Sequence, residues 1–577
     1  MILQALAKYY GRMAKESASG IVQEGFEKKE IPFLIVLDRH GKFIGLQDTR
    51  DGEGKKKRGR VFTVPKGVKK TSGIAANLLW DNPSYILGIP RLDPKKDKKS
   101  LQKRAKEQQA CFIRTIREKF PEPVEDEAIK AVIGFLERGD FAPLFTHPSW
   151  NEIEETGANM TFKFGSDDGL VCQRPYVINA IGNNENNREM AKVRTCLVSG
   201  IQDIPVRLHT AIKGVRGAQS SGANIVSFNL DAFRSFGKEQ GLNAPVGQKA
   251  EFAYTTALNH LLSKGSRQKL QIGDATTVFW AERENLLEDV FAALFGEENP
   301  EQTNAAIRAL YESPKTGAPP LKEDYTPFYV LGLAPNAARI AVRFWHAGTV
   351  GETAKYIWQH FDDCSIAHGP NQPEHLSLFR LLVSTAVLGK AENIQPNLAG
   401  EFMKSLLNGT PYPQTLLASA IRRCLAEREI TYPRAALMKA CLTRRIRYYK
   451  QNEKEIGMSL DTGNSNVGYR LGRLFAVLEK TQEEAIRPDA TIRDRFYASA
   501  SSTPVSAFPH LMKLKNYHLA KLEKGRAINL EKLISEIIDG LTGFPPHLSL
   551  QEQGLFAVGY YHQRQDLFTK KNNKEAA

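Results

Sequence analysis

The residues best suited to recognition chemistry lie in one glycine-rich segment, Lys213–Asn224. It combines three glycines (Gly214, Gly217 and Gly222), two cations (Lys213 and Arg216) and four short polar residues (Gln219, Ser220, Ser221 and Asn224). The glycines allow sharp turns and close backbone approach. The cations can neutralise phosphates, and the polar groups can hydrogen-bond base edges, most readily in a minor groove that small residues can enter. A glycine-rich turn leading into a strand at Ile225–Phe228 is the other interpretation, and both stay open.

A second candidate is the basic stretch, Lys55–Lys70, which has eight Lys or Arg residues and no acidic residue. Its cations are Lys55, Lys56, Lys57, Arg58, Arg60, Lys66, Lys69 and Lys70. Such charges repel one another unless anions neutralise them, and nucleic-acid phosphates would do so. A solvated charged hairpin is the alternative, because Val61–Val64 has the composition of a strand.

A third basic cluster contains Arg444, Arg445 and Arg447, with Tyr448 and Tyr449 directly after them. Aromatic rings among arginines can stack on the exposed bases of a single strand. Ordinary helix packing accounts for the same pattern equally well. The cluster therefore stays a candidate for contact with unpaired nucleic acid.

Catalytic chemistry has little support in the sequence. The adjacent acids Asp167-Asp168 and Asp362-Asp363 could hold a divalent metal, but such pairs more often form turns or face solvent. No GxxxxGK[ST], HExxH or GxGxxG motif occurs, and the twelve histidines are dispersed. We expect no enzyme activity, cofactor or metal. A metal-dependent nuclease remains the alternative, supported only if the purified chain cleaves DNA through these acid pairs.

Composition indicates a soluble protein with a polyanionic partner. The chain has 577 residues, 42% of them hydrophobic, and a formal net charge of +15, so we expect about two to four domains and binding to nucleic acid. No early apolar run has the length of a signal peptide or membrane span. For this reason we expect no membrane association. The six scattered cysteines lack a CxxC pair, which predicts buried thiols in a reducing cytoplasm.

Hydrophobic periodicity predicts an α+β fold with a mainly helical C-terminal bundle. Expected helices cover 2–13, 98–120 and 248–264, and expected strands cover 31–38, 42–46, 193–198, 225–228, 276–281, 328–333 and 340–345. Beyond about 349 helical spacing dominates. The expected regions are 1–345, which includes a possible boundary near 120–170, a helical region at 346–457, and a helical bundle at 458–577.

Several longer blocks carry a family resemblance. They include Leu197–Gly200, Ile212–Ala218, Ser221–Asn229, Asn243–Gly247, Ala257–Leu262, Phe328–Ile340 and Val342–Trp345, with Met1–Leu6, Thr71–Ile74, Leu78–Asn82 and Tyr85–Gly88 nearer the front. Over most of its length the chain resembles the large subunit of type I-C CRISPR Cascade complexes. This similarity is far more specific than any short motif.

The resemblance implies a non-catalytic subunit that recognises the protospacer-adjacent motif in duplex DNA and promotes strand separation and R-loop formation. Implied partners are CRISPR RNA, double-stranded target DNA, the displaced single strand, the backbone and small Cascade subunits, and a separate helicase-nuclease. In related complexes a glycine-rich loop, lysines and a wedge read the motif. Here Gly217–Asn224 suits this role, and Lys69, Lys70, Thr71, Ser72 and Asn77 form a second candidate. A stand-alone protein that binds structured RNA is a further alternative, and it should be stable without partner subunits.

The resemblance also implies that the small subunit can be made from the same message by internal initiation. Met458 suits such a start, because it follows the polar linker Gln451–Gly457 and begins a 120-residue run of helical periodicity. An ordinary linker methionine is the alternative.

Overall fold

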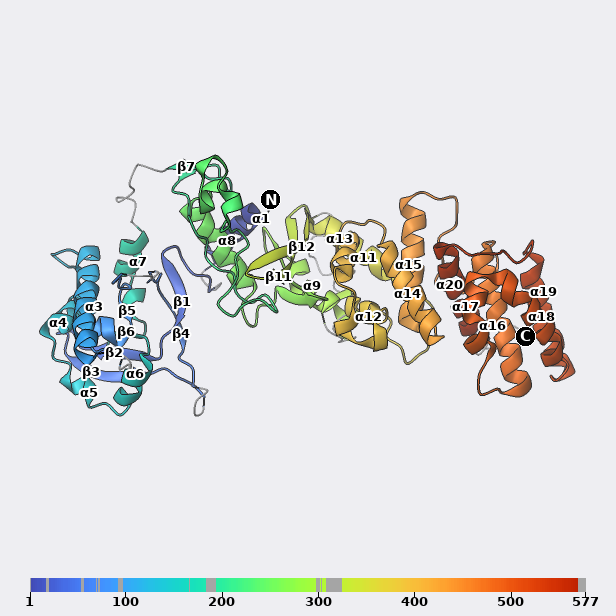
Figure 1. The fold of residues 1–577 in the computed structure, drawn as a ribbon, viewed down its shortest axis with the longest axis horizontal. Coiled ribbons are helices and arrows are strands. Elements are labelled where there is room, and N and C mark those ends of the chain that lie inside the picture. Colours follow the sequence, from blue (N-terminus) through green and yellow to red (C-terminus); the bar gives the residue numbers. More distant parts are fainter. Residues whose placement is uncertain are drawn as a thin grey trace, which may run out of the picture. The chain divides into compact units, whose positions relative to one another are not determined.

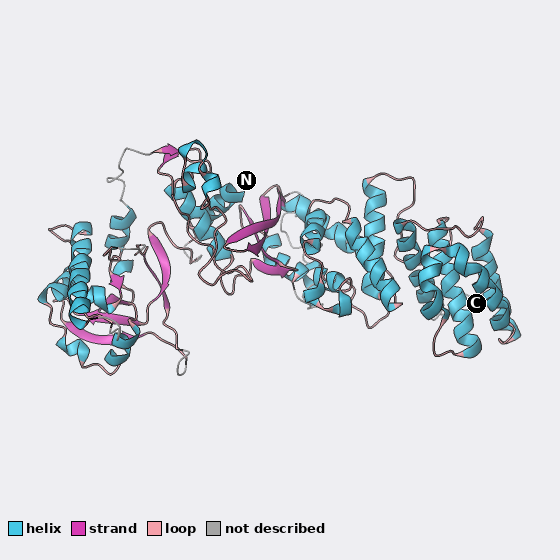
Figure 2. Ribbon diagram, in the orientation of Figure 1, coloured by secondary structure: helices cyan, strands magenta, loops and turns pink. Residues whose placement is uncertain are grey.

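The computed structural model describes residues 2–16, 20–52, 57–68, 70, 73–91, 97–165, 167–182, 193–296, 301, 304–307 and 324–568. The chain forms two compact units (Figure 1). Unit 1 comprises Met1–Arg12, Leu208–Gln240 and Ala257–Ala577, and unit 2 comprises Met13–Arg207 and Gly241–Thr256. Both units contain strands and helices, and helices dominate the C-terminal part (Figure 2), which confirms the expected α+β class. The expected limits at 345 and 457 both fall inside unit 1.

Unit 2 is built on a four-stranded mixed sheet of order β3-β2-β6-β5. Its strands are β2 (Phe33–Leu37), β3 (Phe43–Asp48), β5 (Trp80–Asp81) and β6 (Met160–Phe164). Strand β2 pairs antiparallel with β3 and parallel with β6. The amide of Asp38 donates to the carbonyl of Lys42 across the tight β2–β3 connection, so the predicted hairpin is confirmed. The apolar sequence of β2 fits its central position.

Unit 2 contains the following helices, all of which except α8 bury apolar side chains in one core. They are α2 (Pro83–Ile86), α3 (Lys98–Lys119), α4 (Glu127–Arg138), α5 (Ala142–Phe145), α6 (Trp150–Thr156), α7 (Pro175–Gly182) and the first part of α8 (Gln248–Leu261). Phe112 and Ile116 of α3 join Ile129 of α4 and Phe162 of β6 in that core. The predicted basic helix is therefore confirmed. This core includes residues on both sides of the 120–170 region and within it.

Two short ladders complete unit 2. Strand β4 (Val61–Pro65) pairs with β1 (Phe26–Glu30), and β7 (Arg194–Thr195) pairs with β8 (Gln202–Asp203). The expected strand at Val61–Val64 is confirmed, but the basic stretch does not fold on itself as a hairpin, since the partner of β4 precedes β2. The expected strand 193–198 shortens to the two residues of β7.

Unit 1 opens with α1 (Ile2–Met13, whose last residue falls in unit 2) and contains an antiparallel sheet of order β12-β11-β10-β9. The strands are β9 (Lys269–Ile272), β10 (Ala275–Ala281), β11 (Pro327–Asn336) and β12 (Arg339–Thr349). Every residue of β10 is buried, so both faces of the sheet are covered at this strand. The predictions at 276–281, 328–333 and 340–345 are confirmed. The predicted strand Ile225–Phe228 is wrong, because the segment forms no ladder, and only single bridges at Ala223 and Asn224 precede it.

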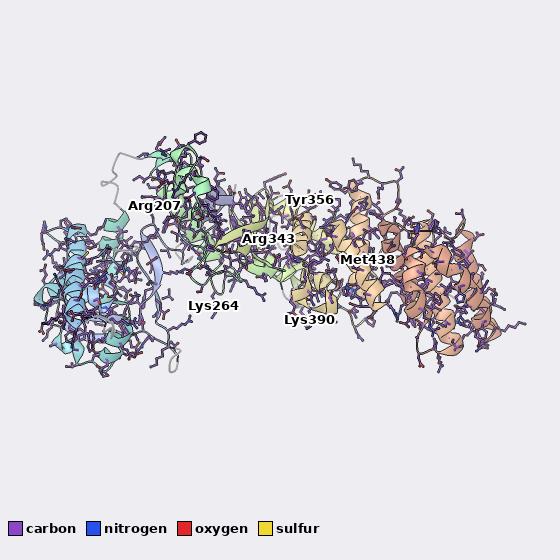
Figure 3. The ribbon with its side chains drawn as sticks, in the orientation of Figure 1. Arg207, Lys264, Arg343, Tyr356, Lys390 and Met438 are labelled. Carbon is purple, nitrogen blue, oxygen red and sulfur yellow. The ribbon has the colours of Figure 1, made fainter. Side chains whose placement is uncertain are left out.

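The helical part of unit 1 comprises α9 (Leu286–Phe295), α11 (Val350–Cys364), α12 (Leu378–Val383), α13 (Leu398–Leu407), α14 (Gln414–Glu427), α15 (Tyr432–Tyr448), α16 (Val467–Ile486), α17 (Ile492–Ser502), α18 (Pro504–Leu519), α19 (Lys524–Asp539) and α20 (Leu550–Phe568). One continuous core runs from the sheet to α20 and includes the fully buried Met438 of α15 (Figure 3). All six cysteines are free and buried, as predicted. Within the described residues, no helix has the length and apolarity needed to cross a membrane.

Candidate nucleic-acid interface

The glycine-rich loop, Lys213–Asn224, stands on a fixed base in unit 1. Ile212, which precedes the loop, and Ala223, near its end, exchange two backbone hydrogen bonds of 2.9 Å. The Lys213 amide donates to Asn259 Oδ1 at 2.8 Å, and the Arg216 amide donates to Thr276 Oγ1 at 3.0 Å. Thr276 belongs to the buried strand β10, so the loop is tied directly to the sheet.

Each of the three glycines has a positive φ, namely 90° at Gly214, 79° at Gly217 and 97° at Gly222. A Cβ at Gly214 would lie 2.5 Å from the Leu262 carbonyl oxygen, and one at Gly222 would lie 2.9 Å from the Ile212 carbonyl oxygen. Left-handed backbone and close approach together require glycine at these two positions. The sharp turns and close approach expected from the sequence are present.

The tip of the loop is open to solvent. Lys213, Arg216, Gly217, Gln219, Ser220 and Ser221 are all exposed, whereas Val215 is 5% exposed and anchors the loop. Asn224 differs from the other polar candidates, because it is half-buried and its Nδ2 donates to the His209 carbonyl at 2.9 Å. Asn224 therefore holds the loop in place, and Gln219, Ser220 and Ser221 remain as side chains free to meet a base edge.

The basic stretch presents its described cations to solvent in unit 2. Lys57, Arg58, Arg60 and Lys66 are exposed, and within the described residues no carboxylate lies within ion-pair distance of them. Backbone hydrogen bonds between Asp51 and Arg58 close the strand-like base of this segment. Lys55 and Lys56 lie outside the described residues. The described part is thus a positive surface, although Lys70 pairs with Asp81 and the carboxylates of Asp48 and Glu152 interact electrostatically with Lys57.

The second candidate, Lys69–Ser72 with Asn77, contains two residues with structural duties. Lys70 Nζ lies 2.6 Å from both carboxylate oxygens of the buried Asp81 and 3.6 Å from the centre of the Tyr85 ring. Asn77 is 5% exposed, and its Oδ1 accepts from the Val68 amide at 3.0 Å. Lys69, Thr71 and Ser72 lie outside the described residues. Both described members thus make contacts within unit 2, and Lys70 is also exposed to solvent.

The arginine cluster on α15 divides into an inner and an outer half. Arg444 is 1% exposed and lies over the Tyr412 ring at 4.5 Å, so burial removes it from any surface contact. Arg447 is partly exposed and pairs with Glu455 through hydrogen bonds of 2.9 and 2.5 Å. Arg445 lies 5.3 Å from the centre of the Tyr449 ring, and Tyr448 and Tyr449 are more than half exposed. Arg445 and the two tyrosines are the open part of the cluster.

Neither acid pair is arranged as a metal site. Asp167 pairs with Arg174 beside the solvent-exposed Asp168. Asp363 is 1% exposed, whereas its neighbour Asp362 faces solvent, because adjacent helical residues point in different directions. Across the residues that the structure describes, no group of three or more His, Cys, Asp or Glu side chains could hold a metal ion. The nuclease alternative finds no geometric support in these pairs.

Sequence reasoning omitted a further basic surface from the candidate sites. The exposed side of α3 carries five cations, Lys98, Lys99, Lys103, Arg104 and Lys106. Lys98 and Lys99 lie in the first turn, where the helix dipole disfavours positive charge, and no described carboxylate pairs with these five. The signal was present as a run of cations at helical spacing.

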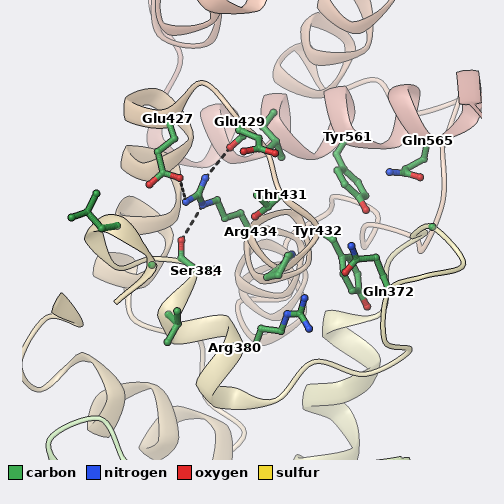
Figure 4. Close-up of a pocket in the computed structure, with 16 residues that line it drawn as sticks. Gln372, Arg380, Ser384, Glu427, Glu429, Thr431, Tyr432, Arg434, Tyr561 and Gln565 are labelled. Carbon is green, nitrogen blue, oxygen red and sulfur yellow. Dashed lines mark hydrogen bonds and ion pairs between the residues drawn. The ribbon is translucent and has the colours of Figure 1, made fainter. Parts of the chain in front are cut away.

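A pocket of about 910 Å³ lies in the helical part of unit 1 (Figure 4). Tyr432 and Arg434 of α15 line one side, and Tyr561 and Gln565 of α20 line another. Arg434 is engaged with Glu427 and with the carbonyls of Ser384 and Glu429. The pocket therefore marks incomplete packing where α20 meets the preceding helices.

Comparison with known families gives one match. Residues 6–568 match the family described as CRISPR-associated protein (Cas_Csd1). Because this match covers nearly the whole chain, the protein belongs to that family, the large subunit of type I-C Cascade. Members of the family are structural subunits of the Cascade complex. No individual curated protein matches the chain.

Proposed function

We propose that this chain is the non-catalytic, DNA-recognising subunit of its Cascade complex, and that the glycine-rich loop reads the protospacer-adjacent motif. The observation that carries the proposal is the contrast within the loop. Its base is fixed to β10 and to Asn259, while Gln219, Ser220 and Ser221 are exposed at its tip. A narrow loop of small polar residues on a fixed support suits a minor groove, where position decides which base edge is met.

The remaining basic surfaces supply contacts that do not depend on sequence. Lys213 and Arg216 flank the tip, and the basic stretch and α3 add exposed cations in unit 2. Such cations bind phosphates of duplex DNA or of CRISPR RNA and release counterions. Arg445 with Tyr448 and Tyr449 offers a stacking surface for the displaced strand. In this proposal strand separation, R-loop formation and recruitment of a helicase-nuclease follow recognition in the cytoplasm.

The test is a titration of the assembled complex with guide-matched duplex DNA that carries either the adjacent motif or a scrambled one. The triple change Gln219→Ala, Ser220→Ala, Ser221→Ala should reduce the preference for the motif by about tenfold or more, since each lost base contact costs about 1–3 kcal/mol. Affinity for the scrambled duplex should change little.

Lys213→Ala with Arg216→Ala provides the matched control at the same loop. This pair should weaken both duplexes equally and reduce the slope of log affinity against log salt by about one unit per lost phosphate contact. Wild-type complex without motif preference would overturn the recognition proposal. A preference that survives the triple change would place motif reading elsewhere.

We further propose that residues 458–577 form a small-subunit-like bundle that is also produced separately from Met458. Within the continuous core of unit 1, the bundle α16–α20 contains an aromatic cluster in which Phe475 contacts Tyr497, Phe508, Phe556 and Tyr560. Only α20 among its helices also packs extensively on α14 and α15, and the pocket in Figure 4 lies along that junction. We expect a bundle that has an internal aromatic cluster, and that joins the preceding helices mainly through α20, to fold as a separate chain.

A fragment that begins at Met458 should therefore co-purify with the complex, and intact-mass spectrometry would detect it. Met458→Leu should remove the fragment while the full-length chain still assembles, because the side chain is 59% exposed. A purified wild-type complex that contains no such mass would refute internal initiation.

A further inference from the structure

Phe236 is the most exposed large apolar residue of the described chain. Its side chain is 97% exposed, and its backbone is left-handed, with φ 57° and ψ 29°. Phenylalanine rarely adopts this conformation, and residues held in it cluster at sites where the conformation serves function. Stability alone would favour a buried ring and an unstrained backbone, so we infer that this turn has a functional role.

The turn around Phe236 is well supported. The Phe233 amide donates to the Leu230 carbonyl, and the Gly237 amide donates to the Arg234 carbonyl, so two consecutive 3₁₀ turns define its path. Beneath it, Phe233 packs edge-on against Phe228 at 5.6 Å. The backbone that carries the exposed ring is therefore held by local hydrogen bonds.

The turn is anchored to the same hairpin as the glycine-rich loop. Arg339, at the start of β12, lies 5.6 Å from the centre of the Phe233 ring and donates to Asn229 Oδ1. The next residue, Ile340, donates from its amide to the Asn224 carbonyl at 3.0 Å. From the other strand, Pro335 Cγ would lie 3.4 Å from a Cβ at Gly217. The β11–β12 hairpin therefore supports both the motif-reading tip and the turn that carries Phe236.

The surroundings favour a nucleic-acid partner for the ring. Arg234 and Lys238, on either side of Phe236, are exposed. Two acids lie further out in the sequence: Asp231 pairs with Arg234 at 3.2 Å, and the exposed Glu239 follows Lys238. Aromatic rings among cations stack on bases, and apolar side chains inserted between base steps part them. A paired and stacked base has no free face, so such a ring gains most from a base that has left its stack.

We propose that Phe236 stacks on the first unpaired nucleobase of the target DNA and holds the strands apart beside the adjacent motif. This assignment rests on the proposed function and names the residue that performs its opening step. No covalent chemistry is involved, because the ring exchanges exposure to water for contact with a base face.

The experiment uses the assembled complex and guide-matched DNA with 2-aminopurine next to the motif, whose fluorescence rises when the base unstacks. One duplex is fully paired, and a second has mismatches at the first positions so that it is already open. Phe236→Ala should slow opening of the paired duplex by about tenfold or more, the scale of a lost base–aromatic contact. Binding of the mismatched duplex should fall less, and Phe236→Trp should retain opening.

Leu388 provides a matched control, because it is also exposed (77%), also left-handed (φ 58°) and also followed by a glycine with positive φ. Leu388→Ala should leave opening unchanged. Equal opening by Phe236→Ala and wild type, or an equal loss on both duplexes, would overturn the assignment. If the wild-type complex shows no preference for the motif on either duplex, the proposed function itself is refuted. This outcome differs from a failure of the Phe236 assignment alone.

Discussion

Replacing Asp363 with Ala should lower the free energy of unfolding of unit 1 by about 3–5 kcal/mol, because it leaves the buried Arg444 without its counter-charge. Asp363 Oδ2 lies 3.7 Å from Arg444 Nε, and Oδ1 lies 3.0 Å from Arg447 Nη1. Burial raises the pKa of Asp363, and the neighbouring Arg444 opposes that rise. Urea unfolding of the full-length chain, followed by far-UV circular dichroism, would measure the effect.

Asp362→Ala is the matched control, since its side chain is the solvent-facing neighbour on the same helix. It should change stability by less than about 0.5 kcal/mol, as surface substitutions usually do. The double change Asp363→Leu with Arg444→Met should recover much of the lost stability, because apolar replacement of a whole buried pair is often tolerated. Equal unfolding of Asp363→Ala and Asp362→Ala would contradict the buried ion pair.

Arg444 shows why a basic run in a sequence does not fix where its cations lie. Its neighbours Arg445 and Arg447 are partly exposed, but Arg444 lies on the face of α15 that packs against α11. The counter-charge that makes burial tolerable, Asp363, is distant in sequence and is itself half of an adjacent acid pair. Local composition does not reveal this pairing, so the sequence pattern predicted a surface site for Arg444 and a turn or solvent-facing position for the Asp362-Asp363 pair, whereas Arg444 and Asp363 form an internal contact.

Secondary structure was predictable where the signal was local. The β2–β3 hairpin and α3 follow from alternation and helical spacing within short windows. By contrast, β4 pairs with β1 across two intervening strands, and Ile225–Phe228 makes no ladder although its composition resembles a strand. Both errors concern strand pairing, because local propensity does not determine which strand a segment pairs with or whether it pairs at all.

The glycine-rich loop was predictable because its glycines meet a local conformational requirement. Positive φ at Gly214, Gly217 and Gly222 is a backbone requirement that the sequence displays directly. The role of Asn224 was not predictable, since an asparagine can equally donate to a base or to a carbonyl of its own chain. Phe236 also escaped notice, because only the fold reveals that its ring is exposed and its backbone left-handed.

Three glycines in the C-terminal bundle carry a requirement of a different kind, the close approach of two helices. In α16, a Cβ at Gly468 would lie 2.4 Å from the Glu552 carbonyl oxygen, and one at Gly472 would lie 2.0 Å from that of Phe556. In α20, a Cβ at Gly559 would lie 2.2 Å from the Tyr469 carbonyl oxygen. The i, i+4 spacing of Gly468 and Gly472 places both on one face of α16. Gly554 of α20 faces the other way, towards Leu417 and Leu442.

Gly472→Ala should therefore destabilise the bundle by about 3 kcal/mol, at the upper end of the usual cost of overpacking, since backbone atoms cannot rotate away from the added methyl. Gly525→Ala in α19 is the matched control, because nothing lies within 4 Å of its added Cβ, and removing a helical glycine stabilises by up to about 1 kcal/mol. Urea unfolding of the two full-length variants would compare them directly, and opposite signs are expected.

The same change tests whether the bundle acts as a unit. Both α16 and α20 lie in the segment that begins at Met458, so a fragment made from that start would depend on the same close approach. Gly472→Ala should remove the co-purifying fragment from the complex while Gly525→Ala retains it. Equal stability of the two variants would show that α16 and α20 do not meet at their backbones. Loss of stability in the full-length chain with an unchanged fragment would show that the separate chain packs these helices differently.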